Sequence, residues 1–397
     1  MRGHLRERSP GHWAIVIDVR DPATGRRKRK WHSFKGAKRE AQIECARLIS
    51  EAQGGGSVDL SRETVAGFID RFVRDWVAVN VSARTAERYR QLLDHVRRHL
   101  GERPLQKVRP EELAALYATL SRSGMAPRTI SHVHSVLFQA LGQAKVWKVV
   151  RDNVAEAVRP PPVRDKELPI LQPDRAREML DALRGNPLYL LASLALATGM
   201  RRNELLALRW RDVDLDAGRL RVELALEETR IHGIRTKAPK TKNGRRTIAL
   251  PAHIVMGLRH HWREQQEQRL ALGMGKAPAD SPVLASIEGK PQSPNTITKA
   301  WPRVMAAIGM PEITLHSLRH THASMLIASG MDVLTISRRL GHGSPTITLR
   351  VYGHLIHGTD DRAAQIMDAA FGNGSNSVAE QAQSARNIAI NKQIGPV

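Results

Sequence analysis

The segment from Leu315 to His354 holds side chains that could act together on a phosphate diester. It begins with L-H-S-L-R-H-T-H and ends with L-G-H-G-S-P-T-I-T-L-R-V-Y-G-H. On a helix, His316 and Arg319 would share one face, because they are three residues apart. His342 follows, and Tyr352 comes ten residues later in a polar, glycine-flanked stretch where we expect an accessible phenol. Cations, imidazoles and a phenol brought together would favour nucleophilic attack on phosphorus.

Two residues of a second cluster, T-G-M-R-R-N-E-L from Thr198 to Leu205, could form an anion clamp. Arg201 and Glu204 are three apart, so one helix face would carry both. The carboxylate could then hold the guanidinium in the single orientation that a preorganised clamp requires. The alternative is a surface ion pair worth well under ~1 kcal/mol, and this cluster alone would favour that alternative.

The overall charge indicates a polyanionic partner. The 397 residues carry a formal net charge of +23, which makes nucleic acid the first candidate and a solvated basic surface the alternative. No apolar run reaches the ~20 residues of a membrane span, and the N-terminus lacks the apolar region of a signal peptide. Cys45 is the only cysteine, so an intramolecular disulfide and thiolate zinc clusters are excluded and a reducing cytoplasm is expected.

A chain of this length should hold two or three domains. We expect residues 1–55 to form a three-stranded sheet plus a helix. The pattern predicts strands at Trp13–Val19 and Arg26–Phe34 and a helix at Lys38–Glu51. The second strand contains five consecutive basic residues, Arg26, Arg27, Lys28, Arg29 and Lys30. Such a strand suits a groove of duplex DNA, or it is a protective edge strand.

Residues 61–158 are predicted to be all-helical, after the flexible linker Gly54–Ser57. The expected helices are Thr64–Val79, Ser82–Leu100, Arg109–Ser121 and Pro127–Trp147. Two of these helices open with a basic and a hydroxyl residue, namely Arg84 with Thr85 and Arg128 with Thr129. Helix N-termini of this kind could hold DNA phosphates, although simple capping is the alternative.

Residues 165–372 form the largest predicted domain, and a polar tail follows at 373–397. Helices are expected at Gln172–Arg184, Pro187–Thr198, His253–Leu272, Thr296–Ile308, Leu318–Ser329, Val333–Leu340 and Arg362–Phe371. Strand character occurs at Arg219–Leu226 and Arg246–Leu250, and Asn243-Gly244 between them is a hairpin-turn signal. The whole chain is therefore predicted to be α+β and mainly α, with a small antiparallel sheet in this last domain.

The order of these motifs resembles the tyrosine recombinase family, the phage-type integrases. The T-G-x-R-x-x-E-L box supplies Arg201, and the H-x-L-R-H box supplies His316 and Arg319. The L-G-H box supplies His342, and the next tyrosine is Tyr352. The family also uses a hairpin lysine, for which Lys240 matches best and Lys242 is the rival. The resemblance implies that residues 1–55 bind arm-type DNA sites, that 61–158 bind core-type sites, and that 165–372 are catalytic.

The resemblance also implies the reaction, a site-specific recombination that integrates or excises a mobile element. Tyr352 would attack phosphorus and expel a 5′-hydroxyl, while Arg201 and Arg319 neutralise the non-bridging oxygens. His316 could accept the phenolic proton, because a phenol with a pKa near 10 needs a base or positive surroundings.

Further residues would support the attack. Lys240 would protonate the leaving oxygen, His342 would hydrogen-bond the phosphate, and Glu204 would support Arg201. A 3′-phosphotyrosyl link keeps the bond energy, so neither ATP nor a metal cofactor is expected. His316, His320 and His322 could suggest a metal site, but the arginine among them would repel a cation.

The expected partner is double-stranded DNA, bound by a homotetramer at core-type and arm-type sites. Participation of an accessory DNA-bending or excisionase protein stays open, as does docking of the helix Arg362–Phe371 in cis or in trans. Two other functions compete, a type IB topoisomerase and a DNA-binding protein that does not cleave. The basic N-terminal segment argues against the first, and the filled catalytic positions argue against the second.

Overall fold

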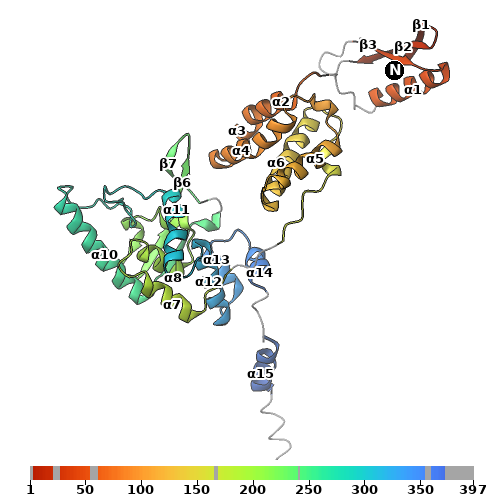
Figure 1. Ribbon diagram of the computed structural model, residues 1–397. Helices are drawn as coiled ribbons and strands as arrows, with labels where there is room; N and C mark the ends of the chain where they lie inside the picture. Colours follow the sequence, from red (N-terminus) through yellow and green to blue (C-terminus); the bar gives the residue numbers. More distant parts are fainter. Residues whose placement is uncertain are drawn as a thin grey trace, which may run out of the picture. The chain divides into compact units, whose positions relative to one another are not determined.

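The computed structural model describes residues 3–20, 27–53, 61–164, 169–239, 242–353 and 359–371. The linker Gly54–Ser57 and the tail 373–397 lie outside these ranges. The chain divides into two compact units, Met1–Lys166 and Glu167–Val397. As predicted, the fold is α+β and mainly helical (Figure 1). Among the described residues no helix has both the length and the apolar character to cross a bilayer.

The first unit begins with a three-stranded antiparallel sheet. Its strands follow the order β1 (Gly3–Ser9), β2 (His12–Arg20) and β3 (Arg27–Lys35). Helix α1 (Lys38–Gln53) packs on β1 and β2, and alternate residues of β2, such as Ile15 and Ile17, are buried beneath it. The predicted strands and helix are confirmed, and β1 supplies the third strand. Because β3 is an edge of this sheet, the protective-edge interpretation of its basic residues remains consistent with the fold.

The rest of the first unit is a helical bundle. Its main helices are α2 (Val65–Phe72), α3 (Ala78–Asn80), α4 (Ala83–Leu100), α5 (Pro110–Arg122) and α6 (Pro127–Val146). A π-helical turn η1 (Val73–Val77) interrupts the single helix predicted before Val79, and the short 3-10 turns are η2 (Leu105–Lys107) and η3 (Val154–Ala157). Amphipathic spacing buries one face of each long helix, so that α4 packs against α6 around a common apolar core.

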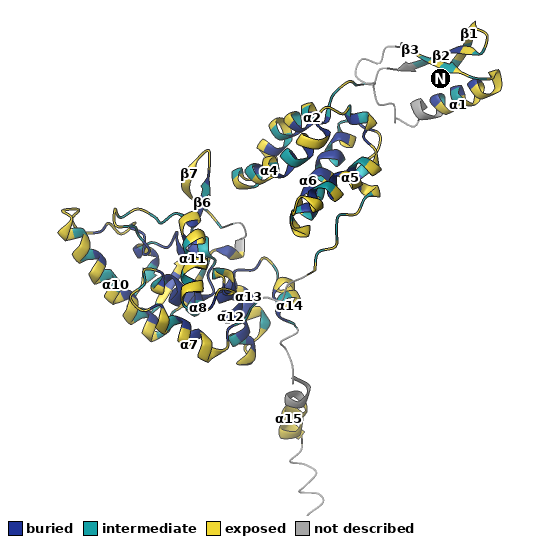
Figure 2. Ribbon diagram, viewed as in Figure 1, coloured by how far each residue is buried: buried dark blue, intermediate teal, exposed yellow. Residues whose placement is uncertain are grey.

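The second unit is built on a buried apolar helix, α8 (Tyr189–Thr198), which packs against α12 (Leu315–Ala328). Figure 2 shows α8 largely in the colour of buried residues. The other helices are α7 (Pro173–Ala182), α9 (Arg202–Leu205), η4 (Trp210–Asp212), α10 (Ala252–Ala271), α11 (Pro294–Ala307), α13 (Val333–Leu340), α14 (Pro345–Tyr352) and α15 (Thr359–Phe371). All the helices predicted here are present, whereas α14 was not predicted.

Two small antiparallel sheets complete the second unit. One has the order β4 (Val213–Asp214), β5 (Arg219–Val222) and β8 (Arg246–Ala249), and the other pairs β6 (Ala225–Thr229) with β7 (Gly233–Lys237). The hairpin turn predicted at Asn243-Gly244 is wrong, because these residues lie in the 3-10 turn η5 (Lys242–Gly244). The tight hairpin turns instead at 230–232, with Gly233 at φ +61°. A tertiary bond explains the difference, since the Asn243 side chain donates to the His342 carbonyl at 3.1 Å.

Candidate active site

Arg319 is held in place by the ends of two other helices. Its Nη1 donates to the Gly199 carbonyl at 2.6 Å, and its Nη2 donates to the Leu340 carbonyl at 2.7 Å. Gly199 ends α8 at φ +63°, and a Cβ there would lie 2.6 Å from His322, so glycine is required. Only 2% of Arg319 is exposed. Burial, followed by the charge of Arg201, lowers the pKa of Arg319 to about 9.

Arg201 forms the expected pair with Glu204. Its Nη1 donates to Glu204 Oε1 at 2.8 Å, and its Nη2 donates to the Gly341 carbonyl at 3.2 Å. The surface ion-pair alternative is wrong, because Glu204 is only 3% exposed. Burial alone would raise the pKa of Glu204, but the guanidinium groups of Arg246 and Arg201 outweigh burial and bring the pKa below its usual value.

Arg246 is a site residue that sequence reasoning missed. It donates to Glu204 Oε2 at 2.8 Å, to the Arg339 carbonyl at 2.6 Å and to the Gly244 carbonyl at 3.0 Å. It thereby connects the start of β8 to the carboxylate that holds Arg201. The sequence offered only an arginine at the start of a strand, and nothing in its local pattern distinguished a buried partner of Glu204 from an exposed charge.

Replacing Glu204 with glutamine should destabilise the protein at neutral pH by about 3 kcal/mol, because two guanidinium groups lose their counter-charge. The folded pKa of Glu204 lies below the unfolded one, so its stabilising charge is present above the unfolded pKa, near 4.3. It is lost as pH falls through the folded value. The difference in free energy of unfolding between the native protein and the variant, measured with urea at pH 7 and at pH 4, should be smaller at pH 4.

Glu288→Gln is the matched control, since Glu288 pairs with Lys290 on the surface. We expect this variant to unfold close to the native protein at both pH values. If the loss of unfolding free energy caused by Glu204→Gln were the same at pH 7 and pH 4, an effect of charge would be contradicted.

Tyr352 is buried, so the expectation of an accessible phenol is wrong. It is the last residue of α14, is 2% exposed and belongs to an apolar cluster with Ala323, Ile327, Ile336 and Leu340. Thr348, one helical turn earlier, is equally buried and shares this face. The sequence pattern did not predict α14, because one of the two residues on its buried face is a polar threonine.

The Tyr352 hydroxyl contacts a histidine that was not assigned to the site. Its oxygen lies 2.6 Å from His320 Nδ1. His316, the expected proton acceptor, lies one turn earlier on α12, is exposed, and meets the His320 ring edge-to-face with centroids 4.5 Å apart. Of the other tyrosines, Tyr117 is buried and Tyr189 is 37% exposed.

The electrostatics of the site follow from burial near arginines. Burial raises the pKa of Tyr352 to about 12, although the nearby Arg319 charge acts to lower it. Burial, the neighbouring His316 and then Arg319 lower the pKa of His320 to about 4. Burial, Arg319 and Arg201 likewise lower the pKa of His342 to about 4. The phenol is therefore protonated and these two imidazoles are neutral at pH 7.

The contacts of His322 explain why it is a poor metal ligand. Its Nδ1 bonds the Leu196 carbonyl at 2.7 Å, and its Nε2 accepts from Arg339 Nε at 3.1 Å. Both ring nitrogens are thus occupied by protein groups. Within the described ranges, no three His, Cys, Asp or Glu residues lie together in a way that could hold a metal ion.

The two lysine candidates differ in their position relative to the described residues. Lys240 lies outside the described residues, and Lys242 begins η5. His342 is placed, with its Nδ1 2.8 Å from Thr348 Oγ1. The structure therefore brings Arg201, His316, Arg319, His342 and Tyr352 into one region of the second unit, together with Glu204.

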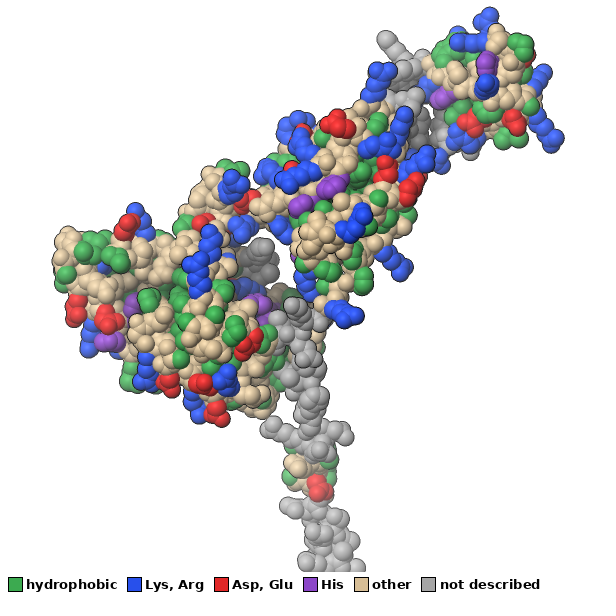
Figure 3. Space-filling view, viewed as in Figure 1, with side chains coloured by type: hydrophobic (Ala, Val, Ile, Leu, Met, Phe, Trp, Pro, Cys, Tyr) green, Lys and Arg blue, Asp and Glu red, His purple; other side chains and the backbone are tan. Residues whose placement is uncertain are grey.

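The basic residues of the N-terminal strand are partly described. Arg26 lies outside the described residues, whereas Arg27 and Lys28 belong to β3. Arg29 is exposed and lies 3.4 Å from Asp18, and Lys30 is half-buried. Trp31, which sequence reasoning did not single out, is 55% exposed beneath the Arg8 guanidinium. Figure 3 shows lysine and arginine side chains over the visible face of this sheet-and-helix segment.

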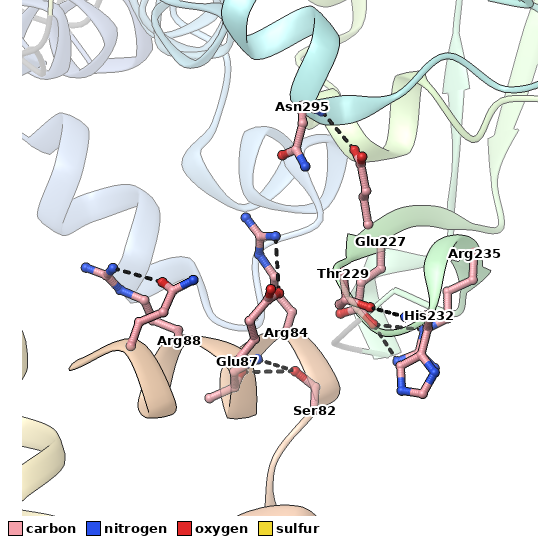
Figure 4. Close-up of polar contacts among 12 residues, drawn as sticks. Ser82, Arg84, Glu87, Arg88, Glu227, Thr229, His232, Arg235 and Asn295 are labelled. Carbon is pink, nitrogen blue, oxygen red and sulfur yellow. Dashed lines mark hydrogen bonds and ion pairs between the residues drawn. The ribbon is translucent and has the colours of Figure 1, made fainter. Parts of the chain in front are cut away.

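The two helix starts in the bundle differ. At α4, Ser82 accepts from the Thr85 amide at 3.3 Å and Arg84 lies 3.8 Å from Glu87, so capping is present (Figure 4). Figure 4 also draws the separate contacts of the β6–β7 hairpin, where Arg235 pairs with Glu227. At α6, no side chain caps the helix; Arg128 is exposed, and Thr129 is half-buried. Binding of DNA phosphates at either start remains a prediction.

Comparisons with known proteins show which sequences and folds this chain resembles. The phage integrase family matches residues 169–357. An integrase of Streptomyces ambofaciens is 30% identical over 379 residues, which cover 91% of this chain and 94% of that protein.

Two solved structures are similar in fold. The Tn1549 transposon integrase with transposon right end DNA has a TM-score of 0.63 at 20% identity, over 77% of this chain and 99% of that one. A lambda integrase tetramer bound to a Holliday junction has a TM-score of 0.51 at 21% identity, over 86% of this chain and 96% of that one.

The family match falls on the unit that contains Arg201, Arg319 and Tyr352, and the Streptomyces integrase extends the similarity to nearly the whole chain. The predicted resemblance is therefore confirmed: this chain belongs to the phage integrase family of tyrosine recombinases, which are DNA strand-transferring enzymes.

Proposed function

We propose that this enzyme cuts and rejoins DNA through a 3′-phosphotyrosyl link to Tyr352 during site-specific integration or excision of a mobile element. The single observation that carries the proposal is the position of the phenol. It lies within the electrostatic influence of Arg319 and in hydrogen-bond contact with His320, an imidazole on the same helix as that arginine. Family membership supports the reaction class, and this arrangement supports the choice of nucleophile.

In the proposed reaction the phenolic oxygen forms a bond to phosphorus as the bond from phosphorus to the 5′-oxygen breaks. Arg201 and Arg319 neutralise the charge that develops on the non-bridging oxygens, and their backbone and carboxylate contacts preorganise them for this role. His342 hydrogen-bonds the phosphate. His316, whose ring packs against that of His320, is proposed to accept the phenolic proton.

The leaving 5′-oxygen requires a proton. Lys240 is proposed as its donor, with Lys242 as the rival. Reversal of these steps by a 5′-hydroxyl from another strand rejoins the DNA and regenerates the free tyrosine. The energy of the broken bond is kept in the phosphotyrosyl link, so the proposed cycle uses neither ATP nor a metal cofactor.

The partner is double-stranded DNA, and we assign two regions of the first unit to it. Residues 61–158 are proposed to bind core-type sites, with Arg84, Thr85, Arg128 and Thr129 at phosphates. Residues 1–55 are proposed to bind arm-type sites through the basic strand β3. The lambda integrase tetramer on a Holliday junction supports a homotetramer as the active assembly. The proposed reaction takes place on the nucleoid of a bacterial host, and an accessory DNA-bending or excisionase protein is compatible with it.

The proposal is tested by identifying the residue that carries the DNA. The protein is incubated with a nicked substrate that loses a short fragment after cleavage, so that the covalent intermediate accumulates. Nuclease and protease digestion followed by mass spectrometry should yield one nucleotide-bearing peptide, the one that contains Tyr352. A modified peptide that contains Tyr89, Tyr117 or Tyr189 would contradict the assignment.

A further inference from the structure

His320 contacts the proposed nucleophile, although it is not among the residues that the sequence motifs assigned to the site. The Tyr352 hydroxyl lies 2.6 Å from its Nδ1. Both side chains are enclosed by protein, since 6% of His320 and 2% of Tyr352 are exposed. Such a short contact between buried polar groups fixes both rings, because separating them would leave each one unpaired.

The direction of this hydrogen bond follows from the protonation states. The buried phenol keeps its proton at pH 7, and His320 is neutral, as their opposite pKa shifts indicate. The phenol therefore donates to Nδ1, and the single imidazole proton lies on Nε2. His320 Nε2 is itself buried without a hydrogen-bond partner in the described protein. This unpaired group has a cost, which indicates that the ring orientation is set by its contact with Tyr352.

The contact belongs to a pair that attaches α14 to the site. Thr348 Oγ1 lies 2.8 Å from His342 Nδ1, and Tyr352, four residues later on the same face, contacts His320 Nδ1. Two neutral imidazoles thus receive the inward face of one short helix. The apolar cluster formed with Ala323 and Ile327 supplies the remaining contacts.

The position of His320 on α12 determines where the contact holds the Tyr352 hydroxyl. His320 is adjacent in sequence to Arg319 on α12, so one rigid helix positions both the phenolic oxygen and the guanidinium proposed to bind the phosphate. A nucleophile held on the same element as the phosphate-binding group loses little freedom on reaching the attack geometry. By contrast, Tyr352 occupies the last position of its own short helix, which leaves its orientation dependent on contacts with other elements.

We propose that His320 is a positioning residue that accepts a hydrogen bond from Tyr352 and thereby fixes the nucleophilic oxygen on α12 beside Arg319. The inference rests on the proposed role of Tyr352. It assigns to His320 the acceptance of a hydrogen bond and not removal of the phenolic proton.

Two substitutions separate these roles. His320→Asn keeps an oxygen acceptor near the position of Nδ1 but cannot take up a proton at neutral pH. His320→Leu has no acceptor. The rate of covalent adduct formation is measured on a nicked substrate with an ordinary phosphate and on one whose bridging 5′-oxygen is replaced by sulfur. A sulfur leaving group needs no protonation, so the second substrate isolates the nucleophile from the leaving group.

We expect His320→Leu to form adduct ~10²-fold more slowly on both substrates, the loss typical of a misplaced reacting group. His320→Asn should stay within ~10-fold of the native rate. DNA affinity should be unchanged in both variants. The protein contains a matched control, because the Tyr117 hydroxyl lies 2.9 Å from His134 Nδ1 in the helical bundle. His134→Leu should leave the adduct rate unchanged.

The inference is overturned if His320→Leu retains the native rate or if the sulfur substrate restores it. It is also overturned if His320→Asn is as slow as His320→Leu, since the ring would then do more than accept a hydrogen bond. Should His320→Leu not fold, His320→Phe keeps an aromatic ring, lacks the acceptor and gives the same comparison. An adduct formed by Tyr352→Phe would contradict the proposed function itself. This outcome therefore distinguishes a failure of the proposed function from a failure of the inference about His320.

Discussion

Replacing Tyr352 with phenylalanine should abolish the covalent protein–DNA adduct while DNA binding survives. The change removes one oxygen and keeps the ring in its apolar cluster. Without that oxygen there is no nucleophile at this position, and the neighbouring imidazoles and guanidiniums cannot replace it. Loss of the bond to His320 should lower the free energy of unfolding by only about 1 kcal/mol. The readout is a denaturing gel of protein trapped on a nicked substrate, with affinity measured separately.

Tyr189→Phe is the control for this experiment. Tyr189 is partly exposed at the start of α8, and its substitution should leave both adduct formation and affinity unchanged. Adduct that persists in Tyr352→Phe would show that another side chain attacks the DNA. Loss of DNA binding in that variant would instead mean that the phenol serves recognition.

The residues proposed to act on the phosphate were candidates from the sequence alone, because the chemistry restricts their types. A phosphate diester needs fixed cations and a nucleophile, and the resemblance of the motif order to the tyrosine recombinases then singled out Arg201, Arg319 and Tyr352 as candidates. Contacts that hold these residues in place were predictable only where the partners are close in sequence. The pairing of Arg201 with Glu204 follows from helical spacing, and the structure confirms this contact.

Contacts between distant segments could not be predicted in the same way. Arg246 reaches Glu204 across 42 positions, and His320 reaches Tyr352 across 32. No local sequence periodicity predicts either of these contacts. The Asn243-Gly244 signal failed for the same reason, since a side-chain bond to the His342 carbonyl holds this segment in a 3-10 turn. Local sequence indicates what a segment can do, whereas tertiary contacts decide which option is realised.

The charges of the site favour the binding of an anion. Among the described residues, Glu204 is the carboxylate that pairs with Arg201 and Arg246, while Arg319 contacts only backbone carbonyls. Positive charge from Arg201 and Arg319 contributes to the lowered pKa of His342, and charge from Arg246 contributes to that of Arg339. A bound phosphate would relieve this repulsion. The fold therefore maintains the cationic environment that a phosphodiester transition state requires.

Arg319→Lys should slow adduct formation by ~10²–10³-fold while changing DNA affinity much less. The buried guanidinium donates to two backbone carbonyls, of Gly199 and Leu340, which fixes the direction of its remaining donors. A lysine ammonium is a point charge on a flexible stem and cannot reproduce this planar fork. Burial would also favour its neutral form, so part of the positive charge would be lost. Adduct formation and affinity are measured on the same nicked substrate.

Arg338→Lys is the matched control, because Arg338 is an exposed arginine of α13. It should form adduct at the native rate, and so would exclude a general effect of exchanging arginine for lysine. If Arg319→Lys also reacted at the native rate, a point charge would suffice and fork geometry would be irrelevant to the phosphate. A large loss of affinity with an unchanged rate for bound DNA would instead assign Arg319 to ground-state binding, because only contacts that strengthen in the transition state accelerate the chemical step.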